Sequence, residues 1–135
     1  RMVVTSIFVM LAGMPLGIAR GAINELIELA TDQTTSGSST LLRDRPAVQA
    51  KVGETEAILS SARAYVLSTA GAAWMAACDG KEDPSREIAG ARLAVTYAIH
   101  EAVRAVDMVF HAAGTNALYT KNPIERHFRD IHVVA

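Results

Sequence analysis

The chain has 135 residues, enough for one domain with its own core but not for two. Its 13 basic and 14 acidic side chains nearly cancel, so charge gives no sign of a nucleic-acid or polyanion partner. Half of the residues are hydrophobic and 5% are aromatic, and a single cysteine, Cys78, excludes a disulfide within the chain. We therefore expect a helical domain packed through small side chains, in a compartment such as the cytoplasm.

Residues 2–19 carry no charge, which meets the length of a membrane span, and a signal peptide is the other targeting alternative. Polar residues, glycines and a proline lower the hydrophobicity of this segment, and the helical pattern continues beyond it through Ile23, Leu26 and Ala30. We interpret residues 3–31 as one helix buried by its neighbours and irregular near Pro15. A chain that starts inside such a pattern is expected to be a fragment of a longer protein.

Residues 32–40 form a polar tract that is too rich in turn-forming residues to continue a helix. The tract is either a solvated connector or a hydroxyl-rich loop that contacts a phosphate or a cofactor. It lacks the lysine and glycine spacing of a P-loop, so the spacing alone does not support phosphate binding.

Two long helices follow, one from about residue 44 to 80 and one from Pro84 to Gly114. Each carries small or branched residues at alternating four- and three-residue steps, which is typical of a helix that packs along a partner for many turns. Trp74 and Met75 are expected to fill the core or a subunit interface. No segment alternates with the period of a strand, and the short connections favour antiparallel neighbours. We predict an all-α, up-and-down four-helix bundle spanning residues 1–135 as a single domain.

The fourth helix is predicted to start at Asn122 and Pro123, a capping residue followed by a proline at the first helical position. Its hydrophobic residues recur along one stripe, at Ile124, Phe128, Ile131 and Ala135. Glu125 and Arg129, and likewise Arg126 and Asp130, are four residues apart and are expected to form ion pairs. The sequence leaves open whether this is a solvated helix face or the wall of a site.

Spacing argues against several kinds of chemistry. His100 and His111 lie roughly 16 Å apart along one helix, His127 and His132 point in different directions, and no Glu-x-x-His pair occurs, so we expect no metal site. Cys78 lies among alanines and is expected to pack, and no nucleophile elbow or dinucleotide fingerprint occurs. His132, flanked by Arg129 and Asp130, remains a candidate general base or a surface residue.

The order of several short motifs resembles the C-terminal helical domain of the acyl-CoA dehydrogenase superfamily over almost the whole chain. The most specific is Pro-x-x-Arg-x-x-Arg-Asp, at residues 123–130. The others are Gly-Ile-Ala-Arg-Gly-Ala at 17–22, the Thr/Ser loop, Asp-Arg-Pro-Ala-Val-Gln at 44–49, Ser-Ala-Arg at 61–63 and Gly-Thr at 114–115. The resemblance implies part of a flavin-dependent oxidoreductase whose other two domains lie outside this chain, so the chain alone is not expected to be active.

Within the superfamily the chain is more similar to the two-component monooxygenases that use reduced flavin on aromatic substrates. The Arg-x-x-Phe-Gly and Gly-Gly-x-Gly-Tyr motifs usual in the dehydrogenases are replaced here by residues 34–43 and 112–116. By this resemblance the flavin, FAD or FMN, would be contacted by Thr35, Ser36, Gly114, Thr115, Arg129 and Asp130.

The resemblance places the catalytic base after the Arg-Asp pair, either at His132 or a few residues beyond Ala135. It also implies a homotetramer built through this domain and a flavin reductase as partner, with neither a nucleic-acid nor a membrane partner. A true acyl-CoA dehydrogenase, and a bundle that serves only for assembly, remain the alternative hypotheses. The substrate cannot be identified from these residues.

Overall fold

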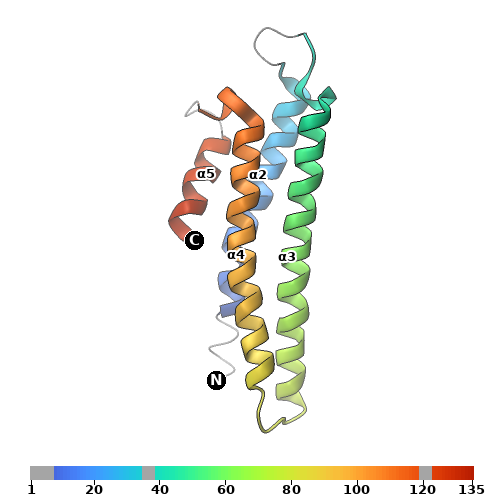
Figure 1. Cartoon of the computed structure of the whole chain (residues 1–135). Coiled ribbons are helices and arrows are strands. Elements are labelled where there is room, and N and C mark those ends of the chain that lie inside the picture. The colour runs from blue at the N-terminus through green and yellow to red at the C-terminus, as the bar shows by residue number, and fades with distance from the viewer. Residues whose placement is uncertain (1–7, 35–38, 119–122) are drawn as a thin grey trace.

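The computed structural model describes residues 8–34, 39–118 and 123–135. Within them the chain is a bundle of long helices (Figure 1) and contains no strand, only an isolated bridge between Thr34 and Leu41. This confirms the predicted all-α class. In chain order the elements are α2 (Gly13–Asp32), η1 (Leu42–Asp44), α3 (Pro46–Cys78), α4 (Ser85–Ala113), η2 (Gly114–Leu118) and α5 (Pro123–Val134).

The helices alternate in direction, as an up-and-down bundle requires. In Figure 1, α3 and α4 lie side by side along their whole length, α2 lies behind them, and the shorter α5 lies beside α2 and α4. The joint between α3 and α4 forms one end of the bundle, and η1 and η2 lie at the opposite end. This arrangement places the ends of the polar loop and the start of α5 on the same side of the molecule.

The first helical segment is interrupted, as expected near Pro15. Residues 8–11 are helical, Ala12 forms a turn, and α2 then begins at Gly13. Pro15 has no N–H to donate to the carbonyl of Leu11, four residues earlier, so a regular helix cannot pass this point without losing a hydrogen bond. The predicted stretch at residues 3–7 lies outside the described residues.

The helix ends follow the predicted proline and glycine signals closely. α3 begins at Pro46, and after its end Gly80 adopts φ +67° in the turn toward α4. α4 begins at Ser85, one residue later than predicted, with the Asp83 carboxylate accepting a hydrogen bond from the Ser85 N–H at 3.0 Å. α5 begins at Pro123, as predicted, and its proposed cap at Asn122 lies outside the described residues.

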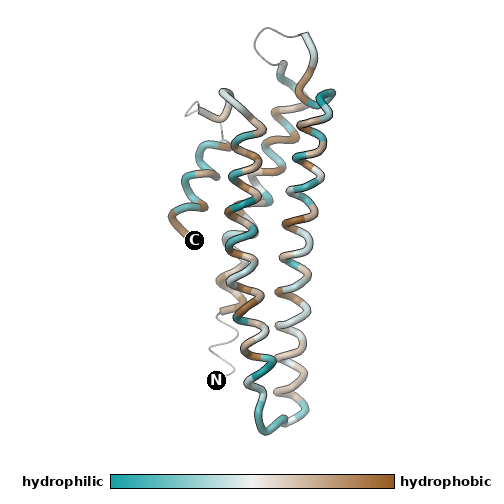
Figure 2. Tube along the Cα trace, viewed as in Figure 1, coloured by the Kyte–Doolittle hydropathy of each residue, from teal (hydrophilic) through white to brown (hydrophobic). Residues whose placement is uncertain are grey.

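The core has two main parts. The larger joins α2, α4 and α5 with part of α3 and contains fully buried branched side chains, among them Ile23, Leu26, Val106, Ile124 and Ile131. The second lies farther along α3 and α4 and is made of smaller residues: Ala12, Ala62, Val66, Ala94, Val95 and Ala98. Hydrophobic residues accordingly recur along the helices between polar ones (Figure 2).

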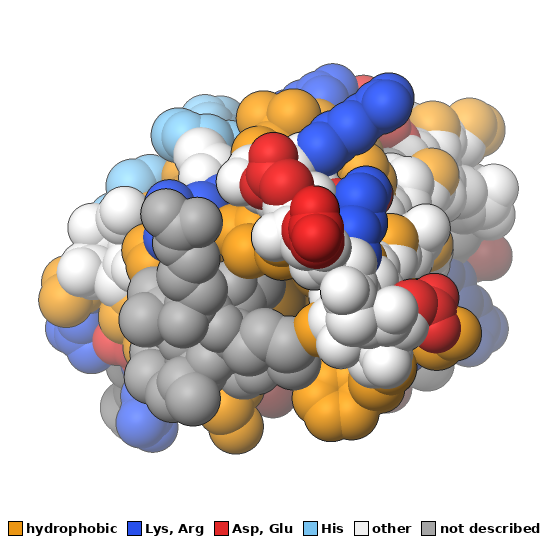
Figure 3. Space-filling view, turned by 90° about the horizontal axis from the view of Figure 1, so that it is seen from below, with side chains coloured by type: hydrophobic (Ala, Val, Ile, Leu, Met, Phe, Trp, Pro, Cys, Tyr) orange, Lys and Arg blue, Asp and Glu red, His pale blue; other side chains and the backbone are white. Residues whose placement is uncertain are grey.

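Several large hydrophobic side chains of α3 and α4 lie outside this core. Trp74 is 59% exposed and Met75 57%, so neither fills the core of this chain, and the alternative of a subunit interface remains. Seen from the end where α3 and α4 are joined (Figure 3), acidic and basic side chains gather at the tip, with hydrophobic surface around them. No helix in the described ranges is long and apolar enough to cross a membrane.

Candidate functional site

An ion pair joins α2 to α3 in the middle of the bundle. Arg20 donates from its two terminal guanidinium nitrogens, Nη1 and Nη2, to the two carboxylate oxygens of Glu56, and Nη2 lies 2.9 Å from Oε2. This hydrogen bonding raises the pKa of Arg20 and lowers that of Glu56, with partial burial acting in the opposite direction on each. Arg20 belongs to the Gly-Ile-Ala-Arg-Gly-Ala segment, and the pair fixes that segment against α3.

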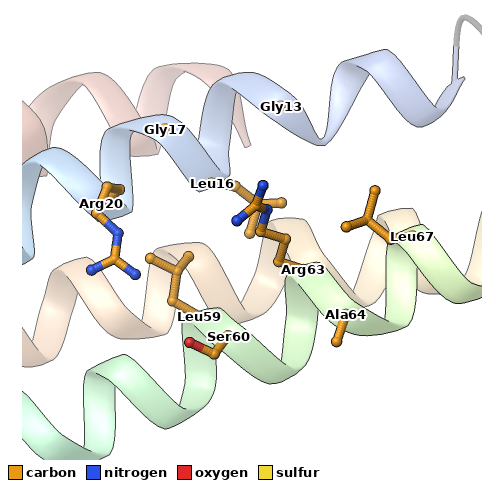
Figure 4. A pocket seen from close by; sticks show the side chains of 9 residues that line it. All are labelled: Gly13, Leu16, Gly17, Arg20, Leu59, Ser60, Arg63, Ala64 and Leu67. Carbon is orange, nitrogen blue, oxygen red and sulfur yellow. The ribbon is translucent and has the colours of Figure 1, made fainter.

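A groove of about 590 Å³ runs between α2 and α3 beside this ion pair. Leu16, Leu59 and Leu67 supply its hydrophobic wall, and Arg20 and Arg63 enter it from opposite helices (Figure 4). Gly17 leaves the backbone of α2 open there, because a β-carbon at this position would have no neighbour within 4 Å. The Arg20 charge is balanced by Glu56, whereas Arg63 has no ion-pair partner among the described residues.

His132 lies in the last turn of α5, where it contacts both its own helix and α4. Its Nδ1 is 2.8 Å from the carbonyl oxygen of Phe128, and its Nε2 is 3.4 Å from Oδ1 of Asp107. The centroid of the Phe128 ring lies 4.6 Å from that of the imidazole and 4.2 Å from that of the Phe110 ring, on which Phe128 is stacked. Sequence reasoning missed Asp107, which is 25 residues before His132 on another helix, and no local pattern indicates the contact.

The adjacent residues Arg129 and Asp130 do not form an ion pair with each other, because each pairs with the residue four positions earlier in α5. Arg126 lies 3.5 Å from Asp130, and Arg129 lies 3.7 Å from Glu125, which confirms both ion pairs predicted from the four-residue spacing. The Arg129 side chain remains 63% exposed and that of Asp130 43%, whereas Ile124 and Ile131 on the opposite stripe are fully buried. The helix therefore anchors by one face and presents Arg129 and Asp130 on the other.

Gly114 and Thr115 lie at the exposed end of α4, where η2 begins. Gly114 adopts φ +60° and ψ −141°, a conformation that strongly favours glycine, and a β-carbon there would meet nothing within 4 Å. The Gly114 N–H already donates a hydrogen bond to the carbonyl of His111, so this glycine offers room for close approach, and the exposed Thr115 supplies a hydroxyl at this end of the bundle. Thr35 and Ser36, the other two residues predicted there, lie outside the described residues.

His127 packs directly on the backbone of α2, a contact that sequence reasoning also missed. A β-carbon at Gly21 would lie 2.7 Å from Cε1 and 3.1 Å from Nε2 of His127, so a larger residue here would have to displace the tip of the imidazole. The glycine at position 21 was the available signal, because a residue without a β-carbon lets a side chain of a partner helix reach the helix backbone. The contact brings α5 against α2 at this position.

The predicted site residues that the structure describes lie at the η2 end of the bundle, for Gly114 and Thr115, and on α5, for Arg129, Asp130 and His132. Within the described residues no group of three His, Cys, Asp or Glu side chains is arranged to hold a metal ion. Cys78, expected to be packed, is instead exposed at the end of α3.

Comparison with known proteins identifies relatives over nearly the whole chain. Residues 9–135 match the family described as acyl-CoA dehydrogenase, C-terminal domain. An indole-3-acetate monooxygenase of Pseudomonas putida is 32% identical over 119 residues, which is 88% of this chain and 31% of that protein. A putative acyl-CoA dehydrogenase of Bacillus subtilis, YdbM, is 28% identical over 122 residues, 86% of this chain and 29% of that protein.

The fold comparison agrees with the sequence comparison. The structure of XiaF from Streptomyces sp. in complex with FADH2 and glycerol superposes with a TM-score of 0.87 at 26% identity, covering 97% of this chain and 33% of that one. The chain therefore spans about a third of the length of the relatives that it matches.

Proposed function

Because the chain belongs to the acyl-CoA dehydrogenase C-terminal domain family, we propose that it is the C-terminal helical domain of a flavin-dependent oxidoreductase. More narrowly, we propose a monooxygenase that uses reduced flavin on an aromatic substrate. The observation that carries this narrower proposal is the similarity to a monooxygenase at 32% identity, together with the fold of an FADH2-bound relative at TM-score 0.87. The proposed chemistry needs reduced flavin, so the proposal includes a flavin reductase as partner and a cytoplasmic location.

The accessible groups of the bundle fit a flavin in their chemistry. The open space beside Gly114 admits close approach, the exposed Thr115 offers a hydroxyl, and the exposed Arg129 guanidinium can meet a phosphate or a polarised ring oxygen. Thr35, Ser36 and Asp130 complete the proposed contacts. The flavin would supply the electron transfer that side chains cannot, while these residues would bind and orient it. The resemblance gives two candidates for the acid–base group, His132 and a position beyond Ala135.

A dehydrogenase is the second candidate, favoured by the 28% identity to the putative acyl-CoA dehydrogenase of Bacillus subtilis. Two measurements on the complete protein separate the alternatives. Oxygen uptake and hydroxylation with supplied reduced flavin are expected for the monooxygenase, and electron transfer from an acyl-CoA for the dehydrogenase. If neither reduced nor oxidised flavin binds, both enzymatic proposals are wrong and a bundle serving only for assembly is left.

We also propose that the protein is a homo-oligomer, with a tetramer as the expected state, assembled through α3 and α4. Four large hydrophobic side chains on these two helices are more than half exposed, which supports this proposal: Leu67, Trp74, Met75 and Leu93. Analytical ultracentrifugation at micromolar concentration tests it. A monomer would contradict this part of the proposal and leave the flavin part standing.

A further inference from the structure

Both ring nitrogens of His132 have oxygen partners, and these partners belong to two different helices. Nδ1 faces the Phe128 carbonyl at 2.8 Å, and Nε2 faces Asp107 Oδ1 at 3.4 Å. A carbonyl oxygen only accepts hydrogen bonds, so Nδ1 must carry the hydrogen. Nε2 then comes within ion-pair distance of the Asp107 carboxylate without forming a hydrogen bond to it. The imidazole is therefore hydrogen-bonded to its own helix on one side and approaches the carboxylate of α4 on the other.

Asp107 has little else with which to pair. Its Oδ1 is buried and forms no hydrogen bond with any described residue. The other cations around the shallow hollow beside it are engaged elsewhere: Lys51 lies 3.0 Å from Glu54, and Arg104 lies 3.2 Å from Glu101. His111, on the same hollow, uses its Nδ1 on the backbone carbonyl of Asp107 at 2.6 Å, not on the carboxylate. Among the described residues, this leaves the His132 imidazole as the basic side chain within ion-pair distance of the Asp107 carboxylate.

The faces of the imidazole are restrained as well as its edges. Phe128 lies against it at 4.6 Å and is itself stacked on Phe110 of α4 at 4.2 Å. A group that transfers a proton in a reaction needs a nitrogen directed at the reacting molecule. Here both nitrogens are directed at the bundle instead.

From these contacts we infer that His132 and Asp107 form a positioning pair that holds the last turn of α5 on α4, and that His132 does not itself transfer a proton. The pair would fix the direction in which Arg129 and Asp130, one turn earlier, face the cofactor. The consequence for activity rests on the proposed flavin-dependent function, whereas the structural coupling of the two residues does not.

The test uses the complete protein and three substitutions of His132 and Asp107. His132→Gln keeps an N–H donor for Asp107 but cannot exchange a proton at neutral pH, His132→Ala removes both properties, and Asp107→Ala removes the acceptor. For a positioning pair, turnover of His132→Gln stays within about threefold of the parent protein, while His132→Ala and Asp107→Ala each weaken reduced-flavin binding by about three- to tenfold. The double alanine variant is then no worse than either single one. If His132→Gln instead loses about a hundredfold in turnover, as His132→Ala does, while Asp107→Ala stays near the parent value, the inference is wrong.

A urea-unfolding cycle on the same variants gives a readout that does not depend on flavin. For a positioning pair, the effects of His132→Ala and Asp107→Ala on the unfolding equilibrium constant are non-additive by about fivefold, and His132→Gln retains most of that coupling. Additive effects would overturn the inference even if flavin binds normally. If the parent protein binds no flavin but the coupling is found, the proposed function fails and the positioning pair stands.

Discussion

The two ends of the bundle are built in different ways. Where α2, α4 and α5 meet, the core holds fully buried branched side chains, including Ile23, Leu26 and Ile131. Along the far half of α3 and α4 the buried residues are mostly alanines, such as Ala62, Ala94 and Ala98. Small side chains let the two helices approach closely, but each removes little hydrophobic area from water.

The far half also exposes the larger hydrophobic residues that its own core does not use. Leu67, Trp74, Met75 and Leu93 are all between 57% and 62% exposed. The end that carries α5 thus buries most of its branched side chains within one chain, whereas the α3–α4 arm keeps larger hydrophobic side chains exposed, as the proposed assembly through this arm requires. The following substitutions test this difference.

The largest effect is expected for Ile131→Ala, which empties a fully buried position between α5 and the rest of the core. Truncation of a buried isoleucine costs about 2–5 kcal/mol through lost transfer free energy and the cavity left behind. Urea unfolding measures the loss. Val133→Ala, on the exposed side of the same helix at 79% exposure, is the control and should change the unfolding free energy by less than about 0.5 kcal/mol. Equal losses for the two variants would mean that α5 is not anchored as described.

Trp74→Ala should affect association more than folding. Because Trp74 is exposed in the single chain, the substitution should change the free energy of unfolding of the monomer little. If the α3–α4 arm is the subunit interface, loss of the indole should weaken association by about 2 kcal/mol, or more than tenfold. Sedimentation equilibrium gives this value. Met10→Ala, which is 78% exposed but lies outside the arm, serves as the matched control and should leave association unchanged.

Gly21→Ala and Gly17→Ala should change stability by different amounts. Each gains about 1 kcal/mol in helix propensity, but a β-carbon at position 21 would displace the tip of the His127 imidazole from α2. Gly17→Ala, with open space around it, should therefore stabilise the chain by about 0.5–1 kcal/mol, while Gly21→Ala should gain less because it loses the imidazole contact. Thermal unfolding of both variants measures the difference, and an equal gain for both would rule out the close contact.

The smallest effect is expected for Glu56→Gln, because the Arg20–Glu56 pair is more than one-third exposed on both sides. Such pairs contribute less than about 1 kcal/mol. The folded state lowers the pKa of Glu56 below its ordinary value of 4.5, so the pair stabilises the fold above that value and loses its contribution as pH falls through the lowered pKa.

The stability difference between the parent chain and Glu56→Gln should accordingly be constant near neutral pH and shrink in acid, as urea unfolding at several pH values will show. A difference that instead grows in acid would contradict the sign of the pKa shift.

The sequence predicted local features well because their causes are local. Pro46, Pro123 and the glycine after α4 mark helix ends through backbone geometry alone, and the ion pairs Glu125–Arg129 and Arg126–Asp130 follow from helical spacing. The buried stripe of α5 was equally predictable from its period.

The contacts between helices were not predictable in the same way. Arg20–Glu56, His132–Asp107 and Gly21–His127 each depend on how far one helix is rotated and shifted along another, which no single segment specifies. The same is true of Trp74, for which the sequence left the core and a subunit interface open and whose position on α3 excludes the core of this chain. The candidate site was therefore predicted as a set of residue types, and its geometry required the packed bundle.

The contact between Gly21 and His127 links two positions that lie far apart in the sequence. The space that a side chain at position 21 would need holds the tip of the imidazole, so the two positions share one volume. A homologous chain with a larger residue at 21 must turn the imidazole away, carry a smaller residue at 127 or separate α2 from α5. Substitutions at these positions should accordingly be accepted as pairs during evolution, and a mutation at either one alone would be a poor guide to what the other tolerates.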